Sequence, residues 1–519
     1  MTKTKTTILL IFILAVGLFL RAYNIDNVPP GIYADEAENG IDAMTANASG
    51  QYQWFYPGNQ GREGLFMNLI ALCFKLFGVS AFTLKLPSII FGTLAIGGIY
   101  LLAKELFSNS RIGFISAFLT AVSFWAINFS RISFRANMVP AILSFSFYFL
   151  WKGLRTKRWH NFAIGGFIFG IGLHTYISFR IAPLILIAMF FALIITRENF
   201  LKKYWTSILV FIAFASLSAG PMFYTFFVAH PEYWESRTGH ISILNPEINQ
   251  GHLFKTFLKT FGLSLAKYNF WGDQNWRHNF PPYALLDPLT GIAFLFGFIY
   301  SLLKTFHLFV LRFGKKVRDQ KLEVYVFLTV WFFVMLIPEV MGYEGNPHSL
   351  RAIGTLPVVF IFAALAFNYI LGKTEDKTLL YKKTVFGLII LMFIFIGLFN
   401  SVKYHLVWAK KIETAKAFDR HLREISGYFN GLPRSTEKYL VADEYPSRPV
   451  KVETSKTENV FYVWPVHIEH IKPKTDDFII IMTDPAEPYL QKLKQMFPGI
   501  NTYTHDKPGG GYFLELKMK

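Results

Sequence analysis

The sequence predicts an all-α polytopic membrane protein that carries a small α/β domain at its C-terminal end. Hydrophobic residues make up 53% of the 519 residues, and the mean hydropathy is +0.34. Many apolar runs approach the roughly 20 residues that cross a hydrocarbon core about 30 Å thick. The formal charge of +18 arises from basic residues between these runs, where cytoplasmic loops need them, so nucleic-acid binding is disfavoured. Cys73, the single cysteine, excludes an internal disulfide and a multi-cysteine zinc site.

The basic loops set the expected topology. Lys3 and Lys5 precede the first apolar run, so residues 6–22 are interpreted as an uncleaved span with a cytoplasmic N-terminus. The run 64–78 is short and carries Lys75, which predicts a juxtamembrane or partly inserted helix on the outer face. Nearly every strongly basic loop then falls inside, at 104–111, 151–160, 196–203, 311–321 and 372–383.

This assignment gives about eleven spans within a transmembrane module of residues 1–400. Its first outer loop is 23–85, and its long outer loop is 229–288. Residues 401–519 are expected outside, as an α/β domain in a protein of the plasma membrane. A helical stretch at 408–429 is followed by three β-like runs, a helix-like run and a last strand, at 438–443, 459–464, 477–483, 488–497 and 511–518.

The expected outer loops mix arginine with histidine, tryptophan and carboxylates, close to the membrane boundary. The first loop contains "YADEAENG" (33–40), with Asp35 and Glu36, just past the first span. Arginine binds phosphate through a planar fork of donors, and a nearby carboxylate can take a proton from an attacking hydroxyl. The sequence therefore indicates group transfer from a lipid phosphate to a hydroxyl, with five arginines that could converge on the phosphate: Arg62, Arg131, Arg135, Arg180 and Arg351.

Each of these features also has a structural alternative. An acidic pair favours a helix N-terminus, and interfacial arginines reach towards lipid head groups. His348 and Arg351 lie one helical turn apart and could cap a loop. Rival functions are a transporter or flippase of an anionic lipid-linked glycan, a scaffold for envelope assembly, and a polymer ligase. The transporter predicts charges near the membrane midplane, whereas most runs here are Phe, Leu and Ile.

The ordered motifs resemble those of the GT-C membrane glycosyltransferases. "YADEAENG" is similar to the acidic motif in the first extracytoplasmic loop of bacterial relatives of the protein O-mannosyltransferases and aminoarabinose transferases. Four later segments look like parts of the same family in the same order, across about 21–360: residues 61–107, "FSRISFRANMVP" (129–140), "GDQNWRHNFPP" (272–282) and "NPHSLRAIGTLP" (346–357). The C-terminal tail carries no motif of this kind.

The resemblance implies a GT-C-like fold and an inverting sugar transfer from a polyprenyl-phosphate donor. The acceptor would be a hydroxyl of a protein, a lipid or a cell-envelope glycan. Asp35 would be the general base, and Glu36 would support it or contact the acceptor. Four residues would stabilise the departing phosphate electrostatically: Arg62, Arg135, His348 and Arg351. Other candidate site residues are Glu63, Arg131, Asn137, His174, Trp271, Asp273, Arg277 and His278.

The expected partners are this donor, an unidentified hydroxyl acceptor and membrane lipids. Some relatives carry an acidic residue just before a proline, where this chain has Asn137. This departure counts against a metal site built from two carboxylates, one in each of the first two outer loops. A divalent cation, Mg²⁺ or Mn²⁺, held by Asp35 and Glu36 stays open, and no cofactor is assigned.

Overall fold

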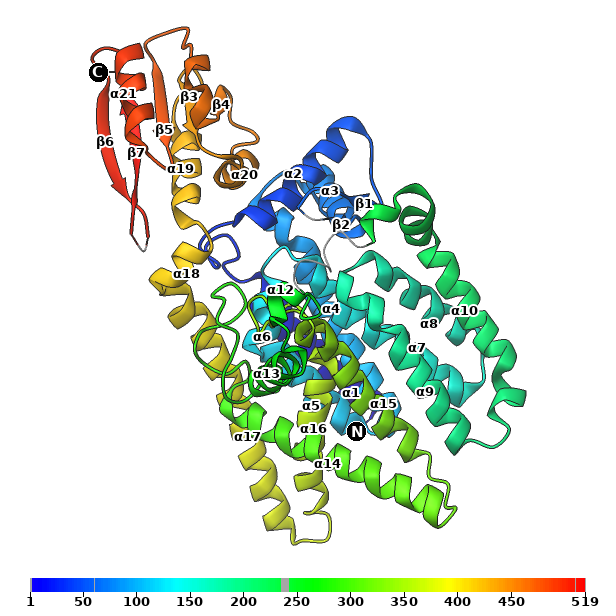
Figure 1. Ribbon diagram of the computed structural model, residues 1–519. Coiled ribbons are helices and arrows are strands. Elements are labelled where there is room, and N and C mark those ends of the chain that lie inside the picture. The colour runs from blue at the N-terminus through cyan, green and yellow to red at the C-terminus, as the bar shows by residue number, and fades with distance from the viewer. Residues whose placement is uncertain (1, 60, 235–241, 509, 519) are drawn as a thin grey trace. The chain divides into compact units, whose positions relative to one another are not determined.

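The computed structural model describes residues 2–59, 61–234, 242–508 and 510–518 (Figure 1). It divides into two compact units. The bundle unit contains Met1–Tyr23, Gln53–Phe66 and Ser88–Tyr404, and the domain unit contains Asn24–Tyr52, Met67–Pro87 and His405–Lys519.

Helices form throughout the predicted transmembrane module. Their bounds are α1 (Lys3–Ala22), α4 (Ala81–Phe107), α5 (Ser110–Val122), α6 (Phe124–Ser130), α7 (Val139–Thr156), α8 (Trp159–Ile171), α9 (Pro183–Thr196), α10 (Phe200–Tyr224), α14 (Pro288–Gly314), α15 (Lys321–Val340), α16 (Leu356–Gly372) and α17 (Leu379–Val402). Within the described residues, eight helical stretches are long and apolar enough to cross a membrane, or nine if α5 and α6, bent by 60°, form one span. The polytopic helical fold is thus confirmed, while the count of about eleven is not, because α7 and α8 fall outside that set.

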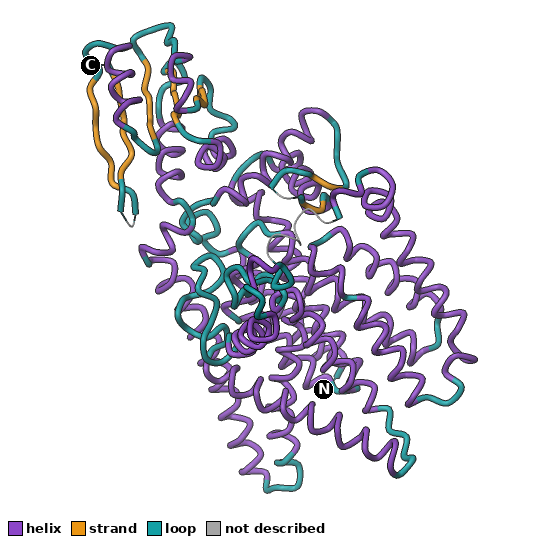
Figure 2. The backbone as a smooth tube through the Cα atoms, viewed as in Figure 1, coloured by secondary structure: helices purple, strands orange, loops and turns teal. Residues whose placement is uncertain are grey.

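Shorter elements connect these helices. The predicted juxtamembrane run is helix α3 (Leu65–Phe77), whose 13 residues are too few to cross a bilayer. The strands β1 (Phe55–Tyr56) and β2 (Arg62–Glu63) pair antiparallel. The predicted long loop contains α12 (Pro246–Asn249) and α13 (Leu253–Ala266), and an irregular segment, drawn in teal in Figure 2, follows α13. Residues 235–241 of this loop, before α12, lie outside the described part of the chain.

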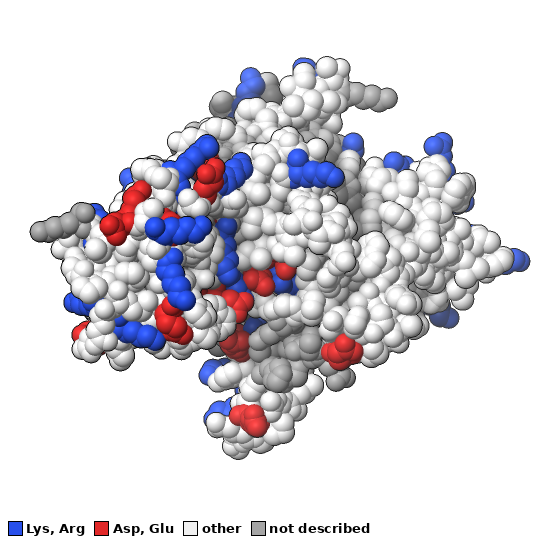
Figure 3. All heavy atoms as spheres, turned by 90° about the horizontal axis from the view of Figure 1, so that it is seen from above, with Lys and Arg blue, Asp and Glu red and all other residues white. Residues whose placement is uncertain are grey.

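Small residues bring the bundle helices close together. A Cβ atom on Gly297 of α14 would lie 1.8 Å from the carbonyl oxygen of Phe362 on α16, and one on Gly166 of α8 would lie 2.2 Å from that of Phe211 on α10. Only glycine permits these approaches, as is common where membrane helices pack. Large apolar side chains such as Leu303 remain exposed on the bundle, and most of the face drawn in Figure 3 carries no charge.

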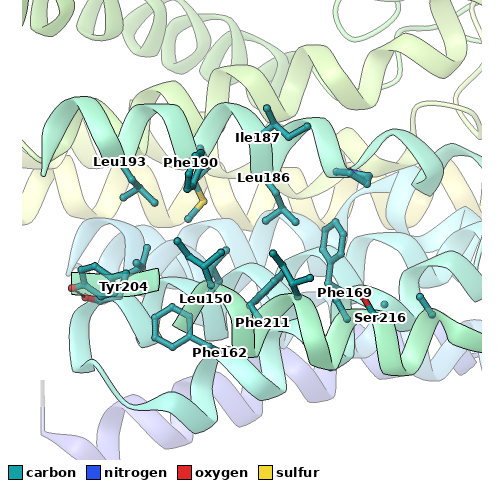
Figure 4. Close-up of a pocket in the computed structure, with 18 of the residues that line it drawn as sticks. Leu150, Phe162, Phe169, Leu186, Ile187, Phe190, Leu193, Tyr204, Phe211 and Ser216 are labelled. Carbon is teal, nitrogen blue, oxygen red and sulfur yellow. Dashed lines mark hydrogen bonds between the residues drawn. The ribbon is translucent and has the colours of Figure 1, made fainter. Parts of the chain in front are cut away.

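Helix α9 stands apart from α8 and α10, and an apolar cavity of about 730 Å³ lies between them. Figure 4 shows Leu186 and Leu193 of α9 on one side, with Phe162 of α8 and Phe211 of α10 opposite. Nearly all the lining atoms are hydrocarbon, so the cavity suits lipid chains rather than water.

The domain unit contains a five-stranded mixed sheet of order β4-β3-β5-β7-β6. Strand β3 pairs in parallel with β4 and β5, and β7 pairs antiparallel with β5 and β6. On β5, Ile480 faces a core with Leu493 of α21, and Ile481 faces one with Phe429 of α19. This alternation lets helices cover both faces of the sheet. The bounds are β3 (Glu437–Val441), β4 (Val460–Val463), β5 (Phe478–Met482), β6 (Asn501–Asp506), β7 (Tyr512–Lys517), α18 (Ile412–Ala417), α19 (Arg420–Gly431), α20 (Glu444–Glu453) and α21 (Glu487–Met496).

The predicted C-terminal α/β fold is confirmed, with three differences. Strand β6, "NTYTHD", was not predicted because an edge strand with mostly exposed residues needs no apolar alternation. Helix α20 contains Pro446 and Pro449, which disguise it in the sequence. The predicted helix over 408–429 breaks between α18 and α19, where Asp419 adopts a φ of 49°.

The acidic-motif segment forms helix α2 (Ala34–Ser49), which packs on α20 within the domain unit. Gly40 makes the approach close, since a Cβ atom there would lie 3.2 Å from the side chain of Val452. Glu38 also pairs with Arg448 of α20, with Oε2 and Nε 2.8 Å apart. Part of the predicted first outer loop therefore folds together with the C-terminal residues.

Candidate functional site

Helix α2 presents the acidic pair in its first turn. Asp35 is half-buried and Glu36 is buried. Acidic residues in a first turn interact favourably with the positive end of the helix dipole. This structural role accompanies any catalytic one, and both side chains are carried by a regular helix rather than by a loop.

The other predicted site residues all lie in the bundle unit, and several meet around Glu63. Its Oε2 atom accepts a hydrogen bond of 2.7 Å from Nε of Arg135. Nη2 of Arg180 lies 3.8 Å from its Oε1 atom. The Arg135 guanidinium also lies over the Tyr176 ring, 5.4 Å from its centroid. We call Glu63, Arg135, Arg180 and Tyr176 the Glu63 cluster; its two guanidiniums and one carboxylate leave one surplus positive charge.

Aromatic rings and His174 enclose this cluster. The Arg180 guanidinium lies 4.6 Å from the ring centroid of Phe226 and 4.5 Å from that of Trp234. His174 places Nε2 2.8 Å from the carbonyl oxygen of Ser218. Burial lowers the pKa of His174, against the raising effects of that carbonyl and of Glu63. His174 is therefore held as a neutral ring at neutral pH.

A second group of predicted residues gathers around Asp273. Its Oδ2 atom lies 3.2 Å from Nδ1 of His278 and accepts a hydrogen bond of 2.6 Å from the Ser349 amide. The rings of His278 and His348 lie 4.7 Å apart. Burial alone raises the pKa of Asp273, but the two histidines and the Ser349 amide reverse the effect and lower it. We call Asp273, His278 and His348 the Asp273 cluster.

A buried ion pair holds the backbone of this cluster in place at His348. Lys267 and Glu339 are both fully buried and pair through Nζ and Oε2. The Oε1 atom of Glu339 accepts a hydrogen bond of 2.9 Å from the His348 amide. Asn346 donates to the Glu339 carbonyl oxygen at 3.2 Å. Neither Lys267 nor Glu339 was predicted as a site residue from the sequence, although each is an ionisable residue beside an apolar run.

Helix α6 and the segment after it link the two clusters. Asn128 donates a 2.7 Å hydrogen bond to the Arg277 carbonyl oxygen. The ring of Phe134 lies 6.0 Å from that of His278, and Arg135 follows it to reach Glu63. Residues from the loops predicted to be outer therefore do converge at one end of the bundle, which we call the site end.

Two of the arginines predicted to bind phosphate donate hydrogen bonds to backbone carbonyl oxygens of the bundle unit. Arg131 is fully buried and donates to the carbonyl oxygens of Leu20 and Arg21 at 3.0 and 2.9 Å, so it caps the end of α1. Arg62, also buried, donates through Nε to the Gly58 carbonyl oxygen at 3.1 Å. These contacts give both arginines a structural role.

Three further candidates, Asn137, Arg351 and Trp271, lie outside both clusters. Asn137 donates 2.8 Å to the Ser88 carbonyl oxygen on α4. Arg351 donates 2.6 Å to the carbonyl oxygen of Glu344 in its own loop. Trp271 is about half exposed.

The Asp273 cluster could also hold a divalent cation. One ligand atom from each of Asp273, His278 and His348 lies within 4.8 Å of the others. Two imidazoles and one carboxylate suit zinc or iron better than Mg²⁺, which prefers oxygen ligands. A second such group in the described chain, at His467 and Glu469 of the domain unit, is exposed, and Lys492 binds Glu469 there.

Comparisons with known proteins bear on the fold. Residues 65–221 match the dolichyl-phosphate-mannose-protein mannosyltransferase family. The chain resembles ArnT from Cupriavidus metallidurans bound to undecaprenyl phosphate, with a TM-score of 0.56 and 11% identity over 99% of this chain and 98% of that one. It also resembles the archaeal oligosaccharyltransferase AglB from Archaeoglobus fulgidus in complex with an inhibitory peptide and a dolichol-phosphate, with a TM-score of 0.54 and 13% identity over 98% of this chain and 74% of that one. No curated protein matches the chain.

Proposed function

We propose that this chain, which has the fold of the GT-C membrane glycosyltransferases, transfers a sugar from a polyprenyl-phosphate donor to an acceptor hydroxyl. The transfer takes place at the outer face of the plasma membrane. The transfer inverts the anomeric carbon. The acceptor hydroxyl belongs to a protein, a lipid or a cell-envelope glycan. The observation that carries the proposal is the Glu63 cluster, a surplus cation held at one end of a membrane bundle of this fold.

The Glu63 cluster binds the donor phosphate in this account. Glu63 orients the guanidinium of Arg135 through a hydrogen bond. The rings of Phe226 and Trp234 pack against the guanidinium of Arg180. Both cations are therefore in place before the reaction. Charge that grows on the phosphate as it departs is stabilised by these fixed donors without reorganisation. Such electrostatic help is the main requirement, because a phosphate is already a good leaving group.

Asp35 acts as the general base, a role assigned from the likeness of "YADEAENG" to the acidic motif of the GT-C transferases. It takes the proton from the acceptor hydroxyl, whose oxygen forms a bond to the anomeric carbon. The bond from that carbon to the phosphate oxygen breaks on the opposite face, and the lipid phosphate leaves with the electron pair. Attack opposite to the leaving group inverts the anomeric configuration. Glu36 supports Asp35 from the same helical turn.

The Asp273 cluster positions His348 beside the phosphate. The Glu339 carboxylate accepts a hydrogen bond from the His348 backbone amide, and the Asp273 carboxylate accepts one from the Ser349 backbone amide. These bonds fix the backbone on which His348 is carried. Protonated imidazole would add positive charge at the phosphate. A divalent cation bound by Asp273, His278 and His348 would supply the same neutralisation.

The distribution of buried ions favours transfer over transport. In the described bundle, Arg21 lies in the last turn of α1, and Glu339 in the last turn of α15. Glu323 lies in the first turn of α15. A transporter would need such charges near the membrane midplane.

The test compares three forms of the purified protein in lipid: wild type, Asp35→Asn and Asp42→Asn. The substrates are radiolabelled polyprenyl-phosphate hexoses, with membrane extract as the acceptor source. Asp42 lies on α2 beyond the acidic pair, so its variant controls for loss of a carboxylate from this helix. We expect sugar transfer by wild type and Asp42→Asn, and a loss of about 100-fold or more in Asp35→Asn, the usual scale for a general base.

Near-full transfer by a folded Asp35→Asn would remove Asp35 as the base. Movement of the intact donor between leaflets, without cleavage of the sugar–phosphate bond, would instead support the flippase. The lipid-movement assay is therefore run on the same vesicles.

A further inference from the structure

A polar pocket lies at the end of the bundle unit opposite to the site end. We call this end the basic end. There α4, α7, α9 and α14 end, and α10 and α15 begin. Helix α15 has 20 residues and runs from this pocket to Glu339 at the site end, a rise of about 30 Å. The pocket has a volume of about 860 Å³, within the range of ligand sites, and the proposed transfer does not use it.

Two ion pairs build the frame of this pocket. Glu323 is buried and accepts hydrogen bonds from Thr196 at 2.9 Å and from Nε of Arg197 at 3.0 Å. Arg155 donates through Nη2 to Glu105 at 3.1 Å. These pairs join α4 to α7 and α9 to α15, so the wall is fixed by contacts between helices.

The remaining cations of the pocket are not neutralised in this way. Five of its lining residues are Lys or Arg, and three are Asp or Glu. Among the described residues, Lys157, Lys304 and Lys321 form no ion pair. The Lys304 ammonium lies over the Tyr300 ring, 5.6 Å from its centroid. The pocket therefore carries a surplus of positive charge on flexible side chains, which suits a phosphate.

The deeper wall is apolar. Leu106, Trp151, Leu154 and Val324 line it and are buried. The pocket thus joins a hydrocarbon-like wall to a cationic rim where the membrane helices end. This combination matches a molecule with a phosphate and an acyl chain at the membrane boundary.

We propose that the basic-end pocket binds an anionic phospholipid, with the phosphate between Lys157, Lys304 and Lys321 and the upper acyl chain against Trp151 and Leu154. A free phosphate compound shares the first half of this chemistry but not the second. The two sources therefore differ in whether the acyl chain contributes to binding.

The test titrates short-chain phosphatidylglycerol into the detergent-solubilised full chain and measures affinity by calorimetry. Parallel titrations use glycerol phosphate, inorganic phosphate and short-chain phosphatidylcholine. The variant is Lys157→Gln/Lys304→Gln/Lys321→Gln. The control, Lys377→Gln/Lys382→Gln/Lys383→Gln, removes equal charge from the loop after α16 and from the start of α17. That loop lies at the same end, because Asn109 beside α4 contacts Asn368 of α16 at 3.2 Å.

We expect phosphatidylglycerol to bind wild type and control equally. The pocket variant should bind it up to about 100-fold more weakly, given about 1 kcal/mol for each lysine near an anionic head group. Equal affinity in wild type and pocket variant would overturn the proposal. Glycerol phosphate that binds as tightly as phosphatidylglycerol would also overturn it and identify a free phosphate ligand.

A second measurement on wild type guards against a variant that fails to fold. Phosphatidylglycerol with a photoreactive group on its acyl chain should crosslink to peptides that contain Trp151 or Val324. Crosslinks confined to other helices would exclude this pocket.

Discussion

The two ends of the bundle carry similar ions in different settings. At the site end, Glu63, Asp273 and Glu339 are buried, and each has at least two donors or cations around it. At the basic end, Glu323 is buried and paired in the frame of the pocket, whereas Lys157 and Lys321 are exposed and unpaired within the described chain. Buried, multiply bonded ions are fixed in place, as catalysis requires, whereas exposed lysines adapt to whatever anion arrives. Burial and pairing, not charge count, distinguish a reaction site from a docking pocket.

The largest expected effect concerns stability and contrasts one ion pair from each end. Glu339→Gln leaves the buried Lys267 ammonium without its carboxylate, which should cost about 3–5 kcal/mol of unfolding free energy. Glu105→Gln breaks a pair whose arginine is more than half exposed and should cost less than about 1 kcal/mol. Unfolding by detergent titration measures both. Equal losses would show that burial does not separate the two ends.

The double variant Lys267→Met/Glu339→Leu sharpens this comparison. Replacing both ions by apolar side chains removes the uncompensated charge, so most of the lost stability should return. Sugar transfer should stay low in the double variant, because the His348 amide loses its acceptor. Recovery of both stability and transfer would assign the pair no part in positioning the site.

Transfer rates should depend on arginine at the site end alone. Arg135→Gln removes a guanidinium fixed by Glu63 and Tyr176, and we expect a loss of about 100-fold in rate, typical of an electrostatic donor. Arg155→Gln removes a guanidinium at the basic end and should change the rate less than about 2-fold. Initial rates with the labelled donor compare the two. A similar loss of rate in both variants would show that the loss comes from impaired folding and not from weaker phosphate binding.

The smallest expected effect is a pH dependence of stability. Burial lowers the pKa of His174, so the unfolded chain takes up this proton first as pH falls below about 6.5. Stability from the neutral ring is complete above that pH and declines below it. His174→Gln should flatten this decline between pH 7 and 5, whereas His307→Gln, at an exposed position of the basic end, should not. Unchanged slopes in both variants would remove His174 as the cause.

Apolar periodicity and loop composition made much of the architecture predictable. Spans of Phe, Leu and Ile must be helical in a membrane, and a short, continuous run rich in isoleucine, such as β5, is typical of a buried strand. The convergence of Arg135, Glu63 and His278 at one end followed from loop order. The partner of each arginine did not, since Arg131 caps a helix while Arg135 meets a carboxylate. Nothing local in the sequence distinguishes these two.

Other features depend on contacts between distant segments. Lys267 and Glu339 lie 72 residues apart, and their pairing arises from how α13 and α15 pack. The packing of α2 on α20 brings together residues about 400 positions apart, among them the ion pair of Glu38 and Arg448. Polar edge strand β6 and proline-containing α20 lack the patterns that identify most strands and helices.

The central claim is an inverting transfer from a lipid phosphate, and the anomeric configuration of the product tests it most directly. Wild type would be given a polyprenyl-phosphate hexose of known configuration at the carbon attached to phosphate, with membrane extract as acceptor. NMR of the purified product would report the configuration at the same carbon. The account predicts the opposite configuration in the product. A retained configuration would contradict direct attack by the acceptor with Asp35 as its base.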